Sequence, residues 1–269
     1  MKKYILIFQF LILLLLTTIR CEIDHGIKPL PGKLAATVYF RGTPPENTQG
    51  IYLVVAPIFP PHAINEMYHS PNSLPIDKDT VYTEIELPYG HYEAVSLWWY
   101  NTETESNLAD ILALPLDPCN NLLPLSFDIS PDEPDFAIDL YANWDRVNRD
   151  AAIEGTIYFN GPFPENTLAT AIAAYKYEPV ENVDYLVYLK SMDFSINDNP
   201  YHYRLPIRHG GVNYIAVYWL PEHADLTDFK NLGIYEDPNN PGQPGKLSLA
   251  EDETITGVDI YVDWSVIEF

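Results

Sequence analysis

The chain carries one thirteen-residue segment twice, and this repeat restricts the folds that it can adopt. Residues 36–48 read ATVYFRGTPPENT and residues 155–167 read GTIYFNGPFPENT, so eight of thirteen positions are identical. A second segment, IDLYANW at 138–144, returns as VDIYVDW at 258–264 with nearly the same offset. Units that recur at a constant offset are the mark of a repeated structural unit. The chain is therefore expected to hold two tandem copies of one domain.

Each copy is long enough to fold around its own core. The repeat places the first copy at 33–146 and the second at 150–269, with the polar run from Arg146 to Asp150 as their boundary. Copies of roughly 115 to 120 residues match the common size of a domain.

The residue pattern within each copy is that of β-strands. Along 136–144 apolar and polar residues alternate, and 258–264 repeats the alternation. Period two indicates a strand with one buried face. Several short strands with turns between them predict an all-β protein made of two internally duplicated, antiparallel β-sandwich domains. Only 105–114 and 224–232 are compatible with short helices.

Two motifs resemble a known family of sandwich domains. Residues 155–161 read GTIYFNG and residues 87–94 read LPYGHYEA. Both resemble strand-and-turn motifs of carboxypeptidase-regulatory and transthyretin-like (prealbumin-like) domains. The resemblance implies a seven-stranded, Ig-like sandwich with a binding, spacer or accessory role. It implies no catalytic residue at any position of this sequence.

The first twenty residues read as a targeting segment. Lys2 and Lys3 precede an almost continuous apolar run from Tyr4 to Leu16. This run is short for a membrane-spanning helix and has the order of a signal peptide. We therefore expect a signal peptide at 1–20, a linker at 21–32, and an exported protein that is periplasmic, on the cell surface or membrane-anchored.

Cys21 follows that segment directly, as in a bacterial lipoprotein signal peptide. Arg20 departs from the lipoprotein pattern, which has a small residue before the cysteine. Two outcomes stay open: lipidation of Cys21, or ordinary cleavage nearby that leaves Cys21 free or paired with Cys119. Two cysteines allow at most one intramolecular disulfide, so the fold does not depend on cross-links.

The charge of the chain excludes one class of partner. The sequence has 38 acidic and 15 basic residues, a formal net charge of −23. Such a chain repels phosphate backbones, so nucleic acid is not expected as a partner. Anionic membranes are disfavoured too, which leaves a lipid anchor as the only expected membrane contact. The partner is unknown from the sequence; a glycan or another envelope protein fits.

The sequence carries no catalytic or metal-binding signature. G-x-S-x-G, H-E-x-x-H, a phosphate-binding glycine loop and paired C-x-x-C are all absent. The acidic segments 128–135 and 251–253 lack the ligand spacing of a calcium loop and are read as solvated loops. We therefore expect a non-catalytic protein without metal or cofactor. The alternative is a hydrolytic enzyme whose residues assemble only in three dimensions.

Two aromatic pairs are the strongest candidates for a ligand site. Trp98 and Trp99 are adjacent in an expected strand, and Tyr218 and Trp219 repeat the arrangement. Neighbouring strand residues point to opposite faces, so one ring of each pair must face away from its core. The outward ring is either covered by a loop or the other domain, which we favour, or open as a platform for carbohydrate.

Removal of residues 1–20 is expected to leave a folded, soluble protein, because the apolar run serves targeting and not a core. Circular dichroism of the truncated protein checks this. Mass spectrometry of the protein purified from its own cells decides the anchor: a diacylglyceryl group on an N-terminal Cys21 indicates lipidation, and an unmodified N-terminus excludes it.

Overall fold

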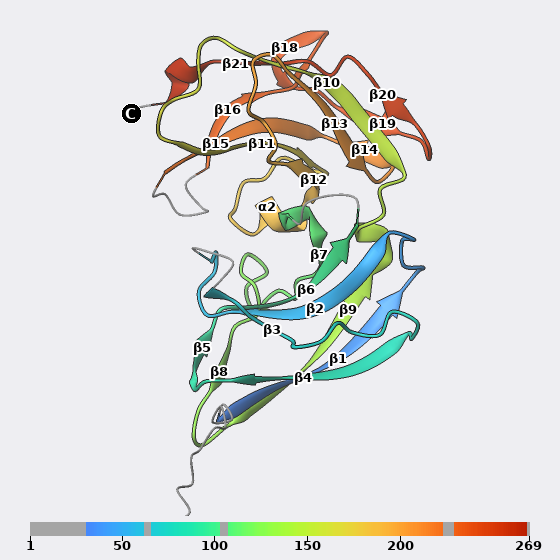
Figure 1. Cartoon of the computed structure of the whole chain (residues 1–269), viewed down its shortest axis with the longest axis vertical. Coiled ribbons are helices and arrows are strands. Elements are labelled where there is room, and N and C mark those ends of the chain that lie inside the picture. Colours follow the sequence, from blue (N-terminus) through green and yellow to red (C-terminus); the bar gives the residue numbers. More distant parts are fainter. Residues whose placement is uncertain (1–30, 62–65, 103–106, 223–228, 268–269) are drawn as a thin grey trace, which may run out of the picture. The chain divides into compact units, whose positions relative to one another are not determined.

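The computed structural model describes residues 31–61, 66–102, 107–222 and 229–267. The expected signal peptide and Cys21 lie outside these residues. Within them the chain forms strands joined by turns and a few very short helices, so it is all-β, as the alternating pattern predicts (Figure 1). No described helix is long and apolar enough to cross a bilayer.

Residues 32–147, here the first sandwich, form two sheets that pack face to face. One sheet has the strand order β4-β1-β9 and the other β3-β2-β6-β7, with a β5–β8 ribbon beside them. Buried residues of both sheets, among them Leu34, Leu97 and Leu140, form one core. The strands are β1 (Gly32–Arg41), β2 (Thr48–Ala56), β3 (Tyr68–His69), β4 (Thr80–Leu87), β5 (Gly90–Tyr92), β6 (Ala94–Asn101), β7 (Ile111–Ala113), β8 (Phe127–Ile129) and β9 (Asp135–Asn143).

Residues 151–267, here the second sandwich, repeat this arrangement around a separate core. One sheet has the order β13-β10-β20 with β21 also paired to β10, and the other β12-β11-β15-β16. Ile153, Val217 and Ile260 belong to its core. The strands are β10 (Ala151–Phe159), β11 (Thr167–Tyr175), β12 (Leu189–Asp193), β13 (Tyr201–Ile207), β14 (Gly210–Val212), β15 (Tyr214–Pro221), β16 (Lys230–Ile234), β17 (Glu236–Asp237), β18 (Asn240–Pro244), β19 (Leu247–Leu249), β20 (Thr254–Ile255) and β21 (Ile260–Val262).

The repeated segments make the same aromatic contact in both sandwiches. Phe40 stacks on Trp144 with ring centroids 5.4 Å apart, and Phe159 stacks on Trp264 at 5.2 Å. Both tryptophans are buried, as the alternation predicts. The contact joins the first strand of each sandwich to the end of its last strand.

The threonine at the end of each thirteen-residue repeat accepts a hydrogen bond from a buried tryptophan. The indole Nε1 of Trp99 donates to Thr48 Oγ1 at 2.9 Å, and that of Trp219 donates to Thr167 Oγ1 at 2.8 Å. A buried indole N–H needs such an acceptor, because leaving it unpaired costs about 1–3 kcal/mol. The identity of the two threonines therefore has a structural reason.

In each sandwich the first strand pairs in parallel with the closing segment, which the alternating pattern does not reveal. β1 pairs antiparallel with β4 and parallel with β9. In the second sandwich β10 pairs antiparallel with β13 and parallel with β20 and β21. The other strand pairs in the described residues are antiparallel.

The closing strand is continuous in the first sandwich and divided in the second. Gly155 of β10 lies where the carbonyl oxygen of Val258 would come within 1.9 Å of a Cβ. Pairing with β10 passes from Ile153↔Ile255 to Ile157↔Ile260, so the closing strand holds one extra residue there. Glycine is required at this point because the bulged backbone occupies the space of a side chain.

The two segments that were compatible with short helices contain strands where the structure describes them. In 107–114 the 3₁₀ turn η2 (Leu108–Asp110) is followed by β7, whose apolar residues complete a sheet. In 224–232, β16 begins at Lys230, and 223–228 lie outside the described residues. A one-turn helix that the sequence did not indicate, α2, spans Asp184–Val187.

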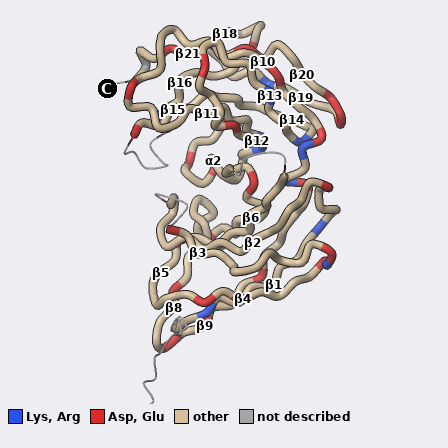
Figure 2. Tube along the Cα trace, viewed as in Figure 1, with Lys and Arg blue, Asp and Glu red and all other residues tan. Residues whose placement is uncertain are grey.

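Acidic residues are distributed over both sandwiches and are not gathered in one patch (Figure 2). His91 and His209 each accompany a carboxylate: His91 Nδ1 lies 2.9 Å from Asp128 Oδ1, and His209 Nδ1 lies 2.7 Å from Asp150 Oδ2. Both histidines stand beside turn glycines, as their place in the sequence suggests. The described residues contain no group of three or more side chains able to hold a metal ion.

Substitution Trp144→Ala is expected to destabilise the protein by about 3–5 kcal/mol, because it removes a buried ring and its stack on Phe40. The matched control is Tyr141→Ala. Tyr141 is 74% exposed and stacks only on Tyr39, so its loss should cost no more than about 1 kcal/mol. Urea denaturation measures both; equal losses would contradict the assignment of Trp144 to the core.

Candidate functional site

The four aromatic residues proposed as ligand contacts are all buried. Trp99 and Trp219 lie in the cores of their sandwiches, with 1% and 3% of their surface exposed. Trp98 and Tyr218 point to the opposite sheet faces, as strand alternation requires, yet they are only 8% and 3% exposed. None of the four presents an open ring face to solvent, which the sugar-platform alternative needs.

Each outward ring is covered: Leu186 of the second sandwich packs with Trp98, whereas Tyr218 lies against Tyr175, Tyr185 and Phe229 of its own sandwich. Trp98 belongs to a cluster with Val54 and Ile111, and Leu186 of helix α2 in the second sandwich completes this cluster. Tyr218 packs in a cluster of the second sandwich to which the first contributes Ala109. The outer faces of the two sheets are therefore parts of an apolar junction.

Trp98 also has an edge on a hollow of about 430 Å³ in the first sandwich. Tyr52, Tyr100 and Met67 line the same hollow. The indole Nε1 of Trp98 is buried without a hydrogen-bond partner in the structure.

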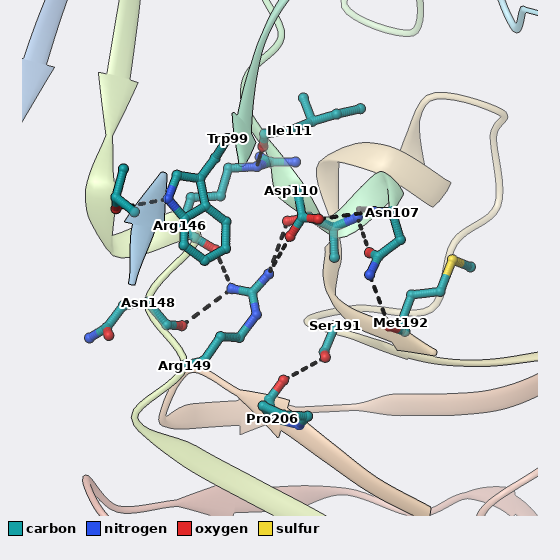
Figure 3. A network of polar contacts seen from close by, with 12 residues as sticks. Trp99, Asn107, Asp110, Ile111, Arg146, Asn148, Arg149, Ser191, Met192 and Pro206 are labelled. Carbon is teal, nitrogen blue, oxygen red and sulfur yellow. Dashed lines mark hydrogen bonds and ion pairs between the residues drawn. The ribbon is translucent and has the colours of Figure 1, made fainter. Parts of the chain in front are cut away.

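The junction is crossed by a partly buried arginine, Arg146, at the end of the 3₁₀ turn η3 (Trp144–Arg146). Its Nε donates to the carbonyl of Ile111 and its Nη2 to that of Leu186, both at 2.6 Å. The first acceptor belongs to the first sandwich and the second to helix α2. One guanidinium group therefore ties both sandwiches together. Figure 3 shows Arg146 beside Ile111, with Arg149 and Asp110 next to it.

Arg149 lies beside it and caps three further carbonyls. It donates to the carbonyl oxygens of Ala109, Arg146 and Asn148 at 3.0–3.3 Å. Its Nη2 is also 3.8 Å from Asp110 Oδ1. Burial lowers the pKa of the Arg149 guanidinium to about 10, although Asp110 opposes this shift.

Asp110 is the acidic member of the network and is 2% exposed. Burial raises the pKa of its carboxyl to about 6, against the opposing effects of the Asn107 N–H and Arg149. The desolvation of this carboxylate therefore outweighs the attraction of the arginine. Asn107 accepts the Ala109 N–H at 2.9 Å and donates through Nδ2 to the carbonyl of Met192 in the second sandwich.

The polar run from Arg146 to Asp150, predicted as the boundary between the two domains, carries two arginines that are partly buried. Backbone carbonyls accept hydrogen bonds from both, and 14% of the Arg149 side chain is exposed. Sequence reasoning missed Asp110, Arg146 and Arg149 as a group. No local signal marks them, since their partners are distant in the chain and are mostly backbone atoms.

A pocket of about 230 Å³ opens at the same junction. The first sandwich contributes Phe59 and Leu108 to its walls, and the second contributes Tyr175, Tyr185 and Tyr218. Among the described residues, the buried hydroxyl of Tyr218 has no hydrogen-bond partner. The pocket is apolar with a small polar component, and no nucleophile–base pair is among its lining residues.

No model of a known protein family matches the chain, and no curated protein sequence matches it. Solved structures match it weakly. A leucine-rich repeat protein from Bacteroides thetaiotaomicron VPI-5482 is 11% identical, with a TM-score of 0.33, over 86% of this chain and 26% of that one. The minor pilin GBS52 of Streptococcus agalactiae is 11% identical, with a TM-score of 0.25, over 86% of this chain and 95% of that one. The major pilin of Streptococcus pyogenes is 8% identical, with a TM-score of 0.19, over 86% of this chain and 96% of that one. The chain thus spans about a quarter of the leucine-rich repeat protein, and none of these TM-scores reaches 0.5.

Substitution Arg149→Met is expected to destabilise the protein by about 3–5 kcal/mol at pH 8, because it leaves Asp110 charged and buried without its partner. The loss should shrink at pH 5. There the Asp110 carboxyl, whose pKa is already raised to about 6 in the intact protein, binds a proton and loses its charge. Guanidinium denaturation at both pH values measures the difference.

The control is Arg204→Met, which breaks an ion pair with Glu154 on the exposed face of β13. Exposed pairs contribute about 0–1 kcal/mol, so this variant should lose little at either pH. A pH-independent loss in the Arg149 variant would show that Asp110 is not the charge that Arg149 compensates.

Proposed function

We propose that this chain is an exported, non-catalytic surface protein whose two sandwiches act as one unit in a binding or spacer role. The observation that carries the proposal is the junction. Arg146 donates hydrogen bonds to backbone carbonyls of both sandwiches, Arg149 lies beside it, and Leu186 of the second sandwich packs with Trp98 of the first.

A spacer or presentation module needs fixed geometry between its domains, and buried contacts of this kind supply it. Interfaces that are apolar and enclose charged groups separate only at a large cost, because the charges lose their partners. The described residues from Pro31 onward also group as one unit by their contacts. An ion pair between Asp145 and Arg208, at 3.1 Å, adds a further link across the junction.

The state of the titratable groups supports a role without catalysis. Of the described carboxyls, Asp110 alone has a clearly raised pKa. Its side chain is buried next to Arg149 and Asn107. A group that no substrate reaches cannot serve as an acid or base. Perturbation of its pKa therefore has a structural cause.

The proposal of export rests on the amino-terminal sequence pattern. It leaves two outcomes open, lipidation of Cys21 or ordinary signal cleavage nearby. The proposal includes origin of the two sandwiches, 33–146 and 150–269, by duplication of one domain. The repeated Trp–Phe stacks and Trp–Thr hydrogen bonds support this origin.

Unfolding of the mature protein in a calorimeter is expected to give a single transition, because neither sandwich can leave the junction without exposing the other. The substitution Leu186→Asp should replace this single transition with two. The change places a charge against Trp98 without touching either core, so each sandwich then melts alone.

Leu168→Asp is the matched control, since Leu168 on β11 is 58% exposed and its replacement should leave the transition single. Two independent transitions in the unmodified protein would overturn the proposal that the sandwiches act as one unit.

A further inference from the structure

The second sandwich has a polar groove where the β17–β18 hairpin meets the ends of β11 and β14. Its volume is about 640 Å³. Its walls combine two tyrosine rings with four side-chain amides, namely Tyr177, Tyr235, Asn213, Asn239, Asn240 and Gln243. The junction described above does not share these residues.

The first sandwich has a counterpart of this groove, which backbone hydrogen bonds identify. The N–H of Glu93 donates to Ala56 as that of Asn213 donates to Tyr175, at 3.0 and 3.1 Å. Glu93 and Asn213 therefore occupy equivalent positions. The first groove measures about 210 Å³, a third of the second, and Leu123 lies in its wall.

The hairpin turns confirm the correspondence. Asp117 Oδ1 accepts the N–H of Cys119 at 2.7 Å, and Asp237 Oδ1 accepts that of Asn239 at 2.9 Å. With the offset of 120 residues, Gln243 of the second sandwich is equivalent to Leu123 of the first. The two turns thus correspond position by position, and residues 123 and 243 differ in their side chains.

Tyr235 can line the second groove because residue 245 also differs from its counterpart in the first sandwich. Gly245 donates its N–H to the Tyr235 carbonyl at 2.8 Å, and Leu125 donates to Pro115 at 2.9 Å in the first sandwich. A Cβ on Gly245 would lie 2.4 Å from two atoms of the Tyr235 ring. The ring can therefore occupy its place only because residue 245 is glycine.

The polar side chains of the two grooves differ in their partners. In the first groove the Glu93 carboxylate accepts the Phe59 N–H at 2.7 Å, and Asp117 accepts the N–H of Cys119. In the second groove, the described residues give the side-chain amides of Asn213, Asn240 and Gln243 no hydrogen bond. These amides are available to a ligand.

We propose that this groove of the second sandwich binds a neutral oligosaccharide. A side-chain amide both donates and accepts hydrogen bonds, as a sugar hydroxyl does, so several amides around one hollow match a ring of hydroxyl groups. Tyrosine rings supply flat apolar surface for the C–H faces of the sugar. A concave site with aromatic walls and a few converging polar groups is the usual form of a small-ligand site.

The charges of the groove and of the chain select a neutral ligand. Glu178 and Asp237 face the groove with Lys246 as the single cation among its lining residues. The formal net charge of −23 also repels polyanions. Acidic polysaccharides are therefore not expected to bind.

The proposal deepens the binding role proposed above and rests on it. Affinity electrophoresis of the mature protein through gels that contain starch, xylan, mannan, β-glucan or galactan provides the test, with polygalacturonate as the acidic probe. Retardation in at least one neutral gel is expected. Tyr177→Ala and Gln243→Ala should each weaken it at least about tenfold, since each removes one contact from a small site.

Two matched variants act as controls: Leu123→Ala, the counterpart of Gln243 in the first groove, and Tyr141→Ala, another exposed tyrosine. Neither should change retardation. Failure of all neutral polysaccharides to bind overturns the proposal, as does binding that the control variants lose equally or binding of unrelated peptides in place of sugars. A single calorimetric transition in the same samples shows that the two-sandwich unit is intact, so failure of the groove is separable from failure of the proposed function.

Discussion

The arrangement of the two sandwiches depends on the guanidinium groups of Arg146 and Arg149. A partly buried arginine is tolerated when its donors are used, and here carbonyls on both sides of the junction accept those of Arg146. Separation of the sandwiches would leave the Leu186 carbonyl without Arg146 and the Met192 carbonyl without Asn107. The aromatic outer faces of the sheets then remain covered as a consequence.

The cores were predictable because their signals are local. The alternation at 136–144 and 258–264 places Trp144 and Trp264 inside, and the structure agrees. The alternation also gave opposite directions to Trp98 and Trp99. What covers Trp98 was not predictable, since Leu186 belongs to the other sandwich and its own segment carries no mark of contact. The parallel pairing of the first and last strands was not predicted for a related reason. Alternation shows which face of a strand is buried, but it does not show which strand lies beside it.

The groove of the second sandwich shows that the repeat held more information than its identical positions. Identity between the copies marks residues that the fold needs, such as Thr48 and Thr167. Differences at positions that share a backbone mark what one copy has changed. Comparison of Leu125 with Gly245 and of Pro115 with Tyr235 displays that change in the sequence itself, although only the structure shows that both replacements meet at one surface.

The parallel pairing of β1 with β9, and of β10 with β21, has a mechanical consequence. The chain enters each sandwich at the start of one strand and leaves it at the end of the strand paired beside it. Tension applied through the chain termini of a sandwich pulls these neighbours along their length in opposite directions. Their hydrogen bonds then bear the load together in shear and do not open one after another. Each sandwich is built to resist extension, a property that suits a protein held at a cell surface while something pulls on its far end.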